Sequence, residues 1–197
     1  MSDGRLSLRR KVKGFLGNPA DTFNGVEAEP LGTALKFLAI WAVVYAVLQT
    51  IMFYTVTRGV FQTLWDLLGL GTTVVSGFNP VAFGLVSVVG AFGGLFISGS
   101  WAHLFVRAFG GRKGYRNTIK AFAYGYTPAL MFGWIPFVGG LFSIWGLVLD
   151  IIGVRQLHGI STGRAVGAVL VSIAVLAVIV VLIVVGVVLT AVLHATA

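Results

Sequence analysis

The stretch from about Ala165 to Leu193 is apolar and carries no formal charge, and it constrains the fold more than any other feature. A membrane-spanning helix needs about 20 apolar residues, because each residue rises about 1.5 Å through a hydrocarbon core about 30 Å thick. Of the 197 residues, 57% are hydrophobic and 10% are charged, whereas soluble domains average about 45–50% and about 25%. The sequence therefore predicts a bilayer protein and excludes a water-soluble enzyme or a disordered chain.

Five apolar stretches predict an all-α membrane bundle of five transmembrane helices. Barrel strands are excluded because the stretches do not alternate apolar and polar residues with period two. A cytoplasmic lead-in precedes the first span, and one long outer loop contains a short helix around Trp65. The predicted spans are about 31–57, 80–106, 119–134, 136–152 and 165–193, with the lead-in at 1–30, the outer loop at 58–79 and the transmembrane domain at 31–197.

The third and fourth spans are short and form a predicted helical hairpin that contains proline. Pro128 interrupts the third span, and the Ile135-Pro136 dipeptide makes a tight turn into the fourth. Lys120, at the start of the third span, is long enough to snorkel to the headgroups. The alternative is a re-entrant hairpin that does not cross the bilayer completely.

Lysine and arginine residues set the predicted orientation. All but one of the 14 Lys and Arg residues fall in, or next to, the N-terminal segment and the second and fourth loops, and Arg58 is the exception. Positively charged loops stay in the cytoplasm. We therefore expect a multi-pass protein with a cytoplasmic N-terminus and a C-terminus on the outer face, as an odd number of spans requires.

Two basic segments on the predicted cytoplasmic side are candidate surfaces for anionic lipid headgroups or a cytoplasmic protein partner. A basic segment beside an anionic leaflet gains about 1 kcal/mol for each Lys or Arg near the surface. The alternative is that these charges only fix the topology, which also explains the net charge of +8 without nucleic acid as a partner. The candidate residues are Arg9, Arg10, Lys11, Lys13, Arg112, Lys113 and Arg116.

Asp150 is the one acidic residue inside the predicted spans. It lies on a stripe of small residues at helical spacing (Gly139, Ser143, Gly146 and Gly153), which must face other helices. An acid at membrane depth is costly unless it is paired or solvated. One interpretation is a buried ion pair that fixes helix register, with Arg155, His103 or Arg107 as partner. The other is proton or ion coupling.

Tyr124 and Tyr126 lie in the short third span, next to Thr127 and Pro128. The proline removes a helix hydrogen bond and frees a carbonyl near Tyr124, which the Thr127 hydroxyl is placed to satisfy. The segment is interpreted as a kinked packing element. The alternative is a broken helix that lines a site, as in transporters.

Catalytic and cofactor motifs are not found in the sequence. Ser100 and His103 share a helix face, but a nucleophile needs a base and an orienting group from other elements. The three histidines, His103, His158 and His194, are far apart in sequence, and there is no cysteine, so we expect no metal site. No phosphate-binding glycine loop occurs. We predict no enzyme activity and no cofactor.

The segment GGRKGYRNTIKAFAYGYTPALMFGWIPFVGG resembles the core of the Yip family (Ypt-interacting or YIPF proteins, which share the Yip-one domain). A basic loop leads to Tyr124, Gly125 and Tyr126, and a hairpin turn follows at Ile135 and Pro136. The runs NPADTF and GISTGRAVGAVL are similar to prokaryotic-type members. Eukaryotic relatives bind Rab-type GTPases and act in vesicle traffic. Their aspartate-leucine-tyrosine-glycine motif is not seen before the first span here, so whether GTPase binding applies to this chain stays open.

Together these features predict a non-catalytic membrane-organising or adaptor protein, a role that is trafficking-like by resemblance. The alternative is a small ion channel or transporter that uses Asp150 and the broken third span. A chain with five helices rarely encloses a wide path alone, so that alternative implies a homo-oligomer.

Overall fold

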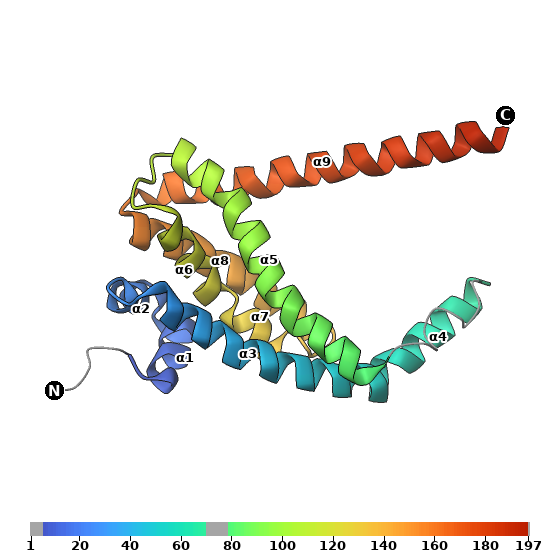
Figure 1. Ribbon diagram of the computed structural model, residues 1–197, viewed down its shortest axis with the longest axis horizontal. Coiled ribbons are helices and arrows are strands. Elements are labelled where there is room, and N and C mark those ends of the chain that lie inside the picture. The colour runs from blue at the N-terminus through green and yellow to red at the C-terminus, as the bar shows by residue number, and fades with distance from the viewer. Residues whose placement is uncertain (1–5, 70–78, 197) are drawn as a thin grey trace.

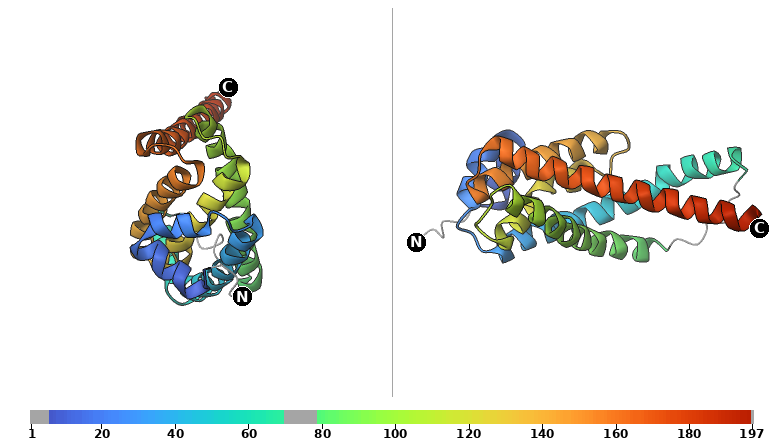
Figure 2. Two further views of the ribbon diagram at one scale, coloured as in Figure 1. Left: turned by 90° about the vertical axis from the view of Figure 1, so that its left-hand side faces the viewer. Right: turned by 90° about the horizontal axis from the view of Figure 1, so that it is seen from above.

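The computed structural model describes residues 6–69 and 79–196, and within them every regular element is a helix. The all-α prediction is confirmed. The N-terminal helices and the end of the last helix lie at opposite ends of the long axis (Figures 1 and 2). The elements are α1 (Leu8–Gly17), α2 (Pro19–Val26), α3 (Leu31–Met52), the π-helical turn η1 (Phe53–Thr57), α4 (Arg58–Leu67), α5 (Pro80–Ala108), α6 (Tyr115–Gly125), α7 (Thr127–Phe132), α8 (Val138–His158) and α9 (Thr162–Thr196).

Local sequence signals explain several helix ends. Ser7 caps α1 by accepting a hydrogen bond from the Arg10 backbone N–H, and Pro19 occupies the first turn of α2, where its missing N–H costs nothing. The Asn79 side chain caps α5 by accepting hydrogen bonds from two backbone N–H groups, the nearer at 2.9 Å. α8 ends at Gly159 in the left-handed conformation, with φ at +65°, which glycine adopts without steric cost.

Four helical segments are long and apolar enough to cross a membrane, counted over the described residues. They are Leu31–Leu67, Pro80–Ala108, Val138–His158 and Thr162–His194. Helices begin at the predicted starts of the first and second spans, at residues 31 and 80. Helix α8 starts after the Pro136 turn and runs past the predicted end at 152.

The predicted third span at 119–134 does not form one continuous helix, so the count of five spans is not confirmed. The chain there forms α6 and α7, which meet at Tyr126, and neither is long enough to cross a bilayer alone. The break occurs where Pro128 lacks the N–H that would continue the helix. The Thr127 hydroxyl donates to the Tyr124 carbonyl at 2.5 Å, as expected for the carbonyl that the proline frees.

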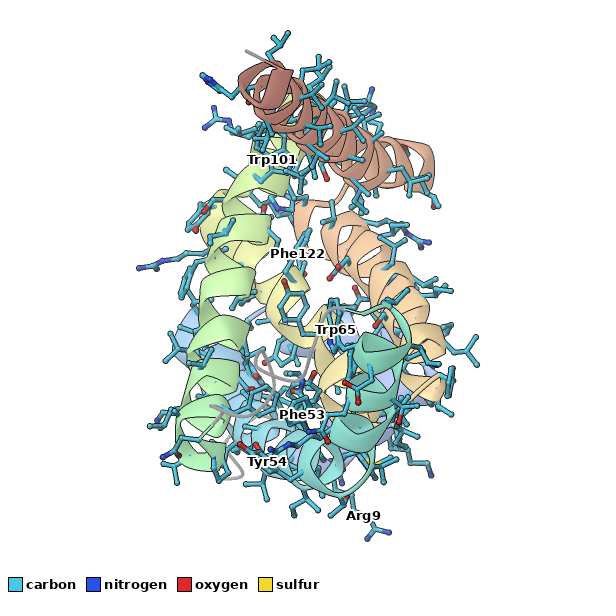
Figure 3. The ribbon with its side chains drawn as sticks, turned by 90° about the vertical axis from the view of Figure 1, so that its right-hand side faces the viewer. Arg9, Phe53, Tyr54, Trp65, Trp101 and Phe122 are labelled. Carbon is cyan, nitrogen blue, oxygen red and sulfur yellow. The ribbon has the colours of Figure 1, made fainter. Side chains whose placement is uncertain are left out.

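The predicted outer loop at 58–79 starts with a helix that continues the first span. Helix α4 follows α3 through η1 and turns away from the bundle (Figure 1), and it carries Trp65 (Figure 3). The short helix expected here is present, although it is joined to the span instead of being separate from it. The rest of the predicted loop, residues 70–78, lies outside the described residues.

The buried core lies toward the end of the bundle that holds α1, α2 and α6, whereas α9 extends beyond it (Figures 1 and 2). Every residue of α9 from Ile173 to His194 is exposed, and Val178 and Leu182 are examples at 58% and 65%. Such an apolar helix is stable in contact with lipid and would aggregate in water. Near its start α9 is held against α5, where the Trp101 indole donates to the Ser172 carbonyl at 2.8 Å (Figure 3).

Candidate functional site: the basic end of the bundle

Basic side chains gather at one end of the bundle. Helix α1, the α5–α6 connection and the α8–α9 connection all lie at this end (Figure 1), which we call the basic end. The fold therefore brings together cations from three distant parts of the sequence. Its exposed or half-exposed cations include Arg9, Arg10, Lys13, Arg107, Arg112, Lys113, Arg116, Arg155 and Arg164.

The candidate lipid-facing residues of α1 divide into two groups. Arg9 points away from the helices (Figure 3), and Arg10 and Lys13 are also exposed. Lys11 is 3% exposed and faces the bundle. Three of the four candidate cations in the lead-in are therefore free to meet a headgroup, and the fourth has a structural role.

Lys11 forms a buried ion pair with Glu29, which lies two residues before the start of α3. Lys11 Nζ lies 2.5 Å from Glu29 Oε2. The Tyr124 hydroxyl donates to the same carboxylate oxygen at 3.0 Å, and the Leu6 backbone N–H donates to Oε1 at 3.2 Å. This carboxylate therefore ties α1, the start of α3 and α6 together.

Lys120 closes the other side of this junction. Its ammonium donates to the carbonyls of Glu27 at 2.6 Å and Glu29 at 2.9 Å, with Val26 O at 3.4 Å. Val26 is the last residue of α2, and Glu27 and Glu29 follow it. A cation beside carbonyls at a helix C-terminus also complements the helix dipole. Lys120 therefore does not snorkel to headgroups, because it caps α2. We call Lys11, Glu29, Lys120 and Tyr124 the N-terminal clamp.

Aromatic side chains surround Tyr124 and exclude water from the clamp. Phe15 stacks on its ring at 4.9 Å, and Phe37 and Phe23 meet it edge-on at 5.4 and 6.3 Å. The Tyr124 hydroxyl donates to the Glu29 carboxylate inside this aromatic cluster. A hydrogen bond in such a water-poor environment is electrostatically stronger than one in water.

Tyr126 and Pro136, two other candidates of the third-span region, line two different hollows. The Tyr126 hydroxyl is 2.8 Å from Ser98 Oγ, and Tyr126 lines a cavity of about 440 Å³ together with Gln49 and Ser143. Pro128 is buried at the start of α7. Pro136 lines a separate hollow of about 200 Å³.

Asp150 does not form the ion pair expected with Arg155, His103 or Arg107. The side chain is 8% exposed, and its Oδ1 has no hydrogen-bond partner. A Cβ placed at Gly125 would overlap this oxygen, so the carboxylate lies against the glycine backbone. No salt bridge reaches Asp150 in the part of the chain that the structure describes.

The glycine stripe around Asp150 packs against other helices, as its spacing predicts. A Cβ at Gly146 would lie 3.1 Å from the Gly125 carbonyl oxygen, and one at Gly153 would lie 2.8 Å from Phe23. Small residues are needed where backbones approach so closely. The stripe is therefore the contact face of α8 with α6 and α2.

His103 is paired with Thr118 and not with Asp150. His103 Nδ1 lies 2.8 Å from Thr118 Oγ1, and His158 Nε2 lies 3.0 Å from the same hydroxyl. The structure thus brings two of the three histidines together. Among residues 6–69 and 79–196, no group of three or more His, Cys, Asp or Glu side chains is arranged to hold a metal ion.

Glu29 and Lys120 are the residues of this region whose roles sequence reasoning missed. Glu29-Pro30 marks only a helix end in the sequence, and its partners are 18 to 95 positions away. One signal was available, because Glu29 is one of six acidic residues in the chain and lies at the mouth of a span. A carboxylate in that place requires a partner.

Comparison with known proteins gives one match. The family model described as the Yip1 domain matches residues 13–185, which is most of the chain. This family is associated with membrane trafficking and is not known for enzymatic activity. No curated protein and no solved structure gives a significant match.

Proposed function

The chain belongs to the Yip1-domain family, and from that premise we propose that it is a non-catalytic membrane-organising or adaptor protein. Together, the family and the four apolar helices make it an integral, multi-pass membrane protein of the Yip type. In this proposal the basic end faces the cytoplasm and binds anionic lipid headgroups. An acidic surface of a cytoplasmic protein is the partner that the same charges would accept.

The observation that carries the proposal is the convergence of exposed cations at one end of the bundle. Helix α1, which carries the exposed Arg9, Arg10 and Lys13, lies at the same end as the α5–α6 connection (Figure 1), and Arg112 and Arg116 lie in or next to that connection. Cations that served only to fix the membrane topology would not need to lie together on a folded surface. Here the N-terminal clamp holds α1 on the bundle, and Lys113 adds an exposed ion pair to Glu27 at 2.7 Å.

A hollow beside α1 has the composition that a lipid requires. It encloses about 480 Å³ and is lined by apolar side chains with two cations, namely Leu8, Val12, Leu16, Trp41, Arg9 and Lys13. The apolar lining suits an acyl chain, while the guanidinium and ammonium groups suit a phosphate. This combination favours lipid over protein as the first partner to test.

The proposed orientation has a cytoplasmic N-terminus and a C-terminus on the outer face. It is supported by the positive-inside rule and by the separation of the basic end from the far end of α9 (Figure 1). Helices α6 and α7 lead away from the basic end before α8 returns to it, so together they would serve as a fifth, broken crossing.

Energy transfer from tryptophan to dansyl-labelled phosphatidylglycerol in proteoliposomes would test lipid binding. We expect wild-type protein to enrich the labelled lipid around itself relative to labelled phosphatidylcholine. The triple variant Arg9→Gln/Arg10→Gln/Lys13→Gln should lose most of this enrichment, and 0.5 M salt should weaken it, because exposed charges are screened. Arg58→Gln, which removes a cation outside the basic end, is the control.

Equal enrichment in the triple variant and the wild type would contradict the proposal. The channel or transporter alternative is not carried forward, since the family match gives it no support.

A further inference from the structure

A basic hollow lies between the end of α5 and the start of α6. It encloses about 360 Å³ and is lined by His103, Arg107, Gly111, Arg112 and Gly114. Three of these five residues have basic side chains, and none has a carboxylate. Across the described residues no salt bridge neutralises either arginine. We call this hollow the His103 pocket.

Backbone groups add to the positive potential at the pocket. Helix α6 starts directly after Gly114, which has φ at +85°, and no side chain caps its first turn. The first N–H groups of a helix lack internal partners, and they carry the positive end of the helix dipole. No acidic residue occurs in that first turn.

Hydrogen bonding behind the pocket determines which ring nitrogen of His103 carries the proton. The single hydroxyl proton of Thr118 can go to His103 Nδ1 or to His158 Nε2, but not to both. His158 Nδ1 is buried without a partner, close to Gly111. A buried N–H without an acceptor is rarer than an unused lone pair. His158 therefore donates through Nε2, and Thr118 donates to His103 Nδ1.

This arrangement makes His103 a donor toward the pocket. With Nδ1 accepting, the proton of the neutral imidazole is on Nε2, and no protein group in the described ranges hydrogen-bonds that nitrogen. The pocket therefore presents one imidazole N–H and two guanidinium groups, and the groups lining it include no competing acceptor side chain.

We propose that the His103 pocket binds the phosphate group of an anionic ligand. Guanidinium groups form paired, charge-assisted hydrogen bonds to phosphate oxygens, and a fixed imidazole N–H adds directionality. The phosphate can come from a lipid headgroup or from a soluble phosphate compound. The inference rests on the proposed function only in placing the pocket at the cytoplasmic lipid surface.

The first arm of the test uses inorganic phosphate and the full-length protein in an uncharged detergent. Calorimetric titration at constant ionic strength should show binding at one site. Arg107→Gln/Arg112→Gln should weaken it by about tenfold or more, as expected for lost hydrogen bonds to charged groups. Lys36→Gln/Arg58→Gln removes the same charge from residues that line neither this pocket nor the hollow beside α1, and it should leave the affinity within about twofold.

The second arm identifies the source of the phosphate. Native mass spectrometry of protein released from nanodiscs would count bound phosphatidylglycerol and phosphatidylcholine. One phosphatidylglycerol lost in Arg107→Gln/Arg112→Gln, and not displaced by millimolar inorganic phosphate, would assign the pocket to lipid. A site that inorganic phosphate fills, with no lipid lost in the variant, would assign it to a soluble phosphate compound.

Thr118 variants test the hydrogen-bond chain behind the pocket. Thr118→Ser keeps the hydroxyl and should bind like the wild type, whereas Thr118→Val removes it and should weaken phosphate binding. Nitrogen NMR shifts of labelled His103 should show the Nε2–H tautomer in the wild type and in Thr118→Ser. An Nδ1–H tautomer in the wild type would overturn the assignment of His103 as a donor.

Either of two results would overturn the inference. One is the absence of both phosphate and lipid binding by folded wild-type protein. The other is an equal loss in the Arg107→Gln/Arg112→Gln and Lys36→Gln/Arg58→Gln variants, which would show attraction to net charge alone. The proposed function fails separately, if cations on α1 have no effect on lipid enrichment while the pocket still binds phosphate.

Discussion

Lys11 Nζ lies 2.5 Å from Glu29 Oε2, and both side chains are 4% exposed. The pair joins the basic N-terminal helix to a residue two positions before the first span. Glu29 neutralises Lys11, the one cation of α1 that points into the bundle. The other cations of α1 can therefore face outward. The exposed cations of α1 are therefore held in place by the buried Lys11–Glu29 contact, which lipids and partners cannot reach.

Removing one member of this pair should destabilise the protein strongly. Glu29→Gln leaves the Lys11 ammonium buried without its counter-charge, and breaking buried pairs costs about 3–5 kcal/mol. We expect a clear fall in the unfolding temperature followed by intrinsic tryptophan fluorescence in detergent.

The exposed pair between Lys113 and Glu27 is the matched control. Both side chains are nearly half exposed, and such pairs contribute about 0–1 kcal/mol. Glu27→Gln should therefore change the unfolding temperature little. Equal effects of Glu29→Gln and Glu27→Gln would contradict the structural role of the clamp.

Gly125→Ala should disrupt the contact between α6 and α8. Its Cβ would overlap Asp150 Oδ1, and this oxygen belongs to a buried side chain. Overpacking of a close contact costs about 1–3 kcal/mol. Gly140→Ala is the control, because no atom lies within 4 Å of its Cβ. A Gly125→Ala protein as stable as Gly140→Ala would show that the two helices are not packed this closely.

Asp150→Asn should leave the protein folded and no less stable. The structure gives Asp150 no cation to lose, and asparagine has almost the same shape. Thermal unfolding of the purified variant would measure this. A loss of about 3 kcal/mol or more would reveal a buried ion pair and would restore the interpretation made from the sequence alone.

Thr127→Val should destabilise the break between α6 and α7. The Tyr124 carbonyl would lose the hydroxyl that satisfies it at 2.5 Å, and a buried acceptor without a partner costs about 1–3 kcal/mol. Thr127→Ser keeps the hydroxyl and should retain most of the stability in the same unfolding measurement. Similar losses in both variants would assign the effect to packing of the threonine methyl group.

The membrane helices could be predicted because their signals are local. Pro30 and Pro80 mark the first two starts, and the charge-free run after Ala165 admits no other structure in a bilayer. The stripe along α8 was also predictable, since helical periodicity alone places Gly146 and Gly153 on one face.

The candidate site could be predicted only in part, because its contacts join distant positions. Lys120 was predicted to reach headgroups, but the end of α2 offers it unpaired carbonyls that are closer. Asp150 was expected to pair with a cation at the same depth, whereas Gly125 leaves space for the carboxylate against its backbone. The spacing of residues along one helix does not show which side chains of a neighbouring helix face them.

The orientation of the basic end is the central claim, and cysteine labelling tests it directly. The chain has no cysteine, so Arg112→Cys and His194→Cys each introduce a single thiol at opposite ends of the structure. In intact cells, a membrane-impermeant maleimide should label His194→Cys and should label Arg112→Cys only after the membrane is opened. Labelling of Arg112→Cys in intact cells, or of neither end until the cells are opened, would contradict the account.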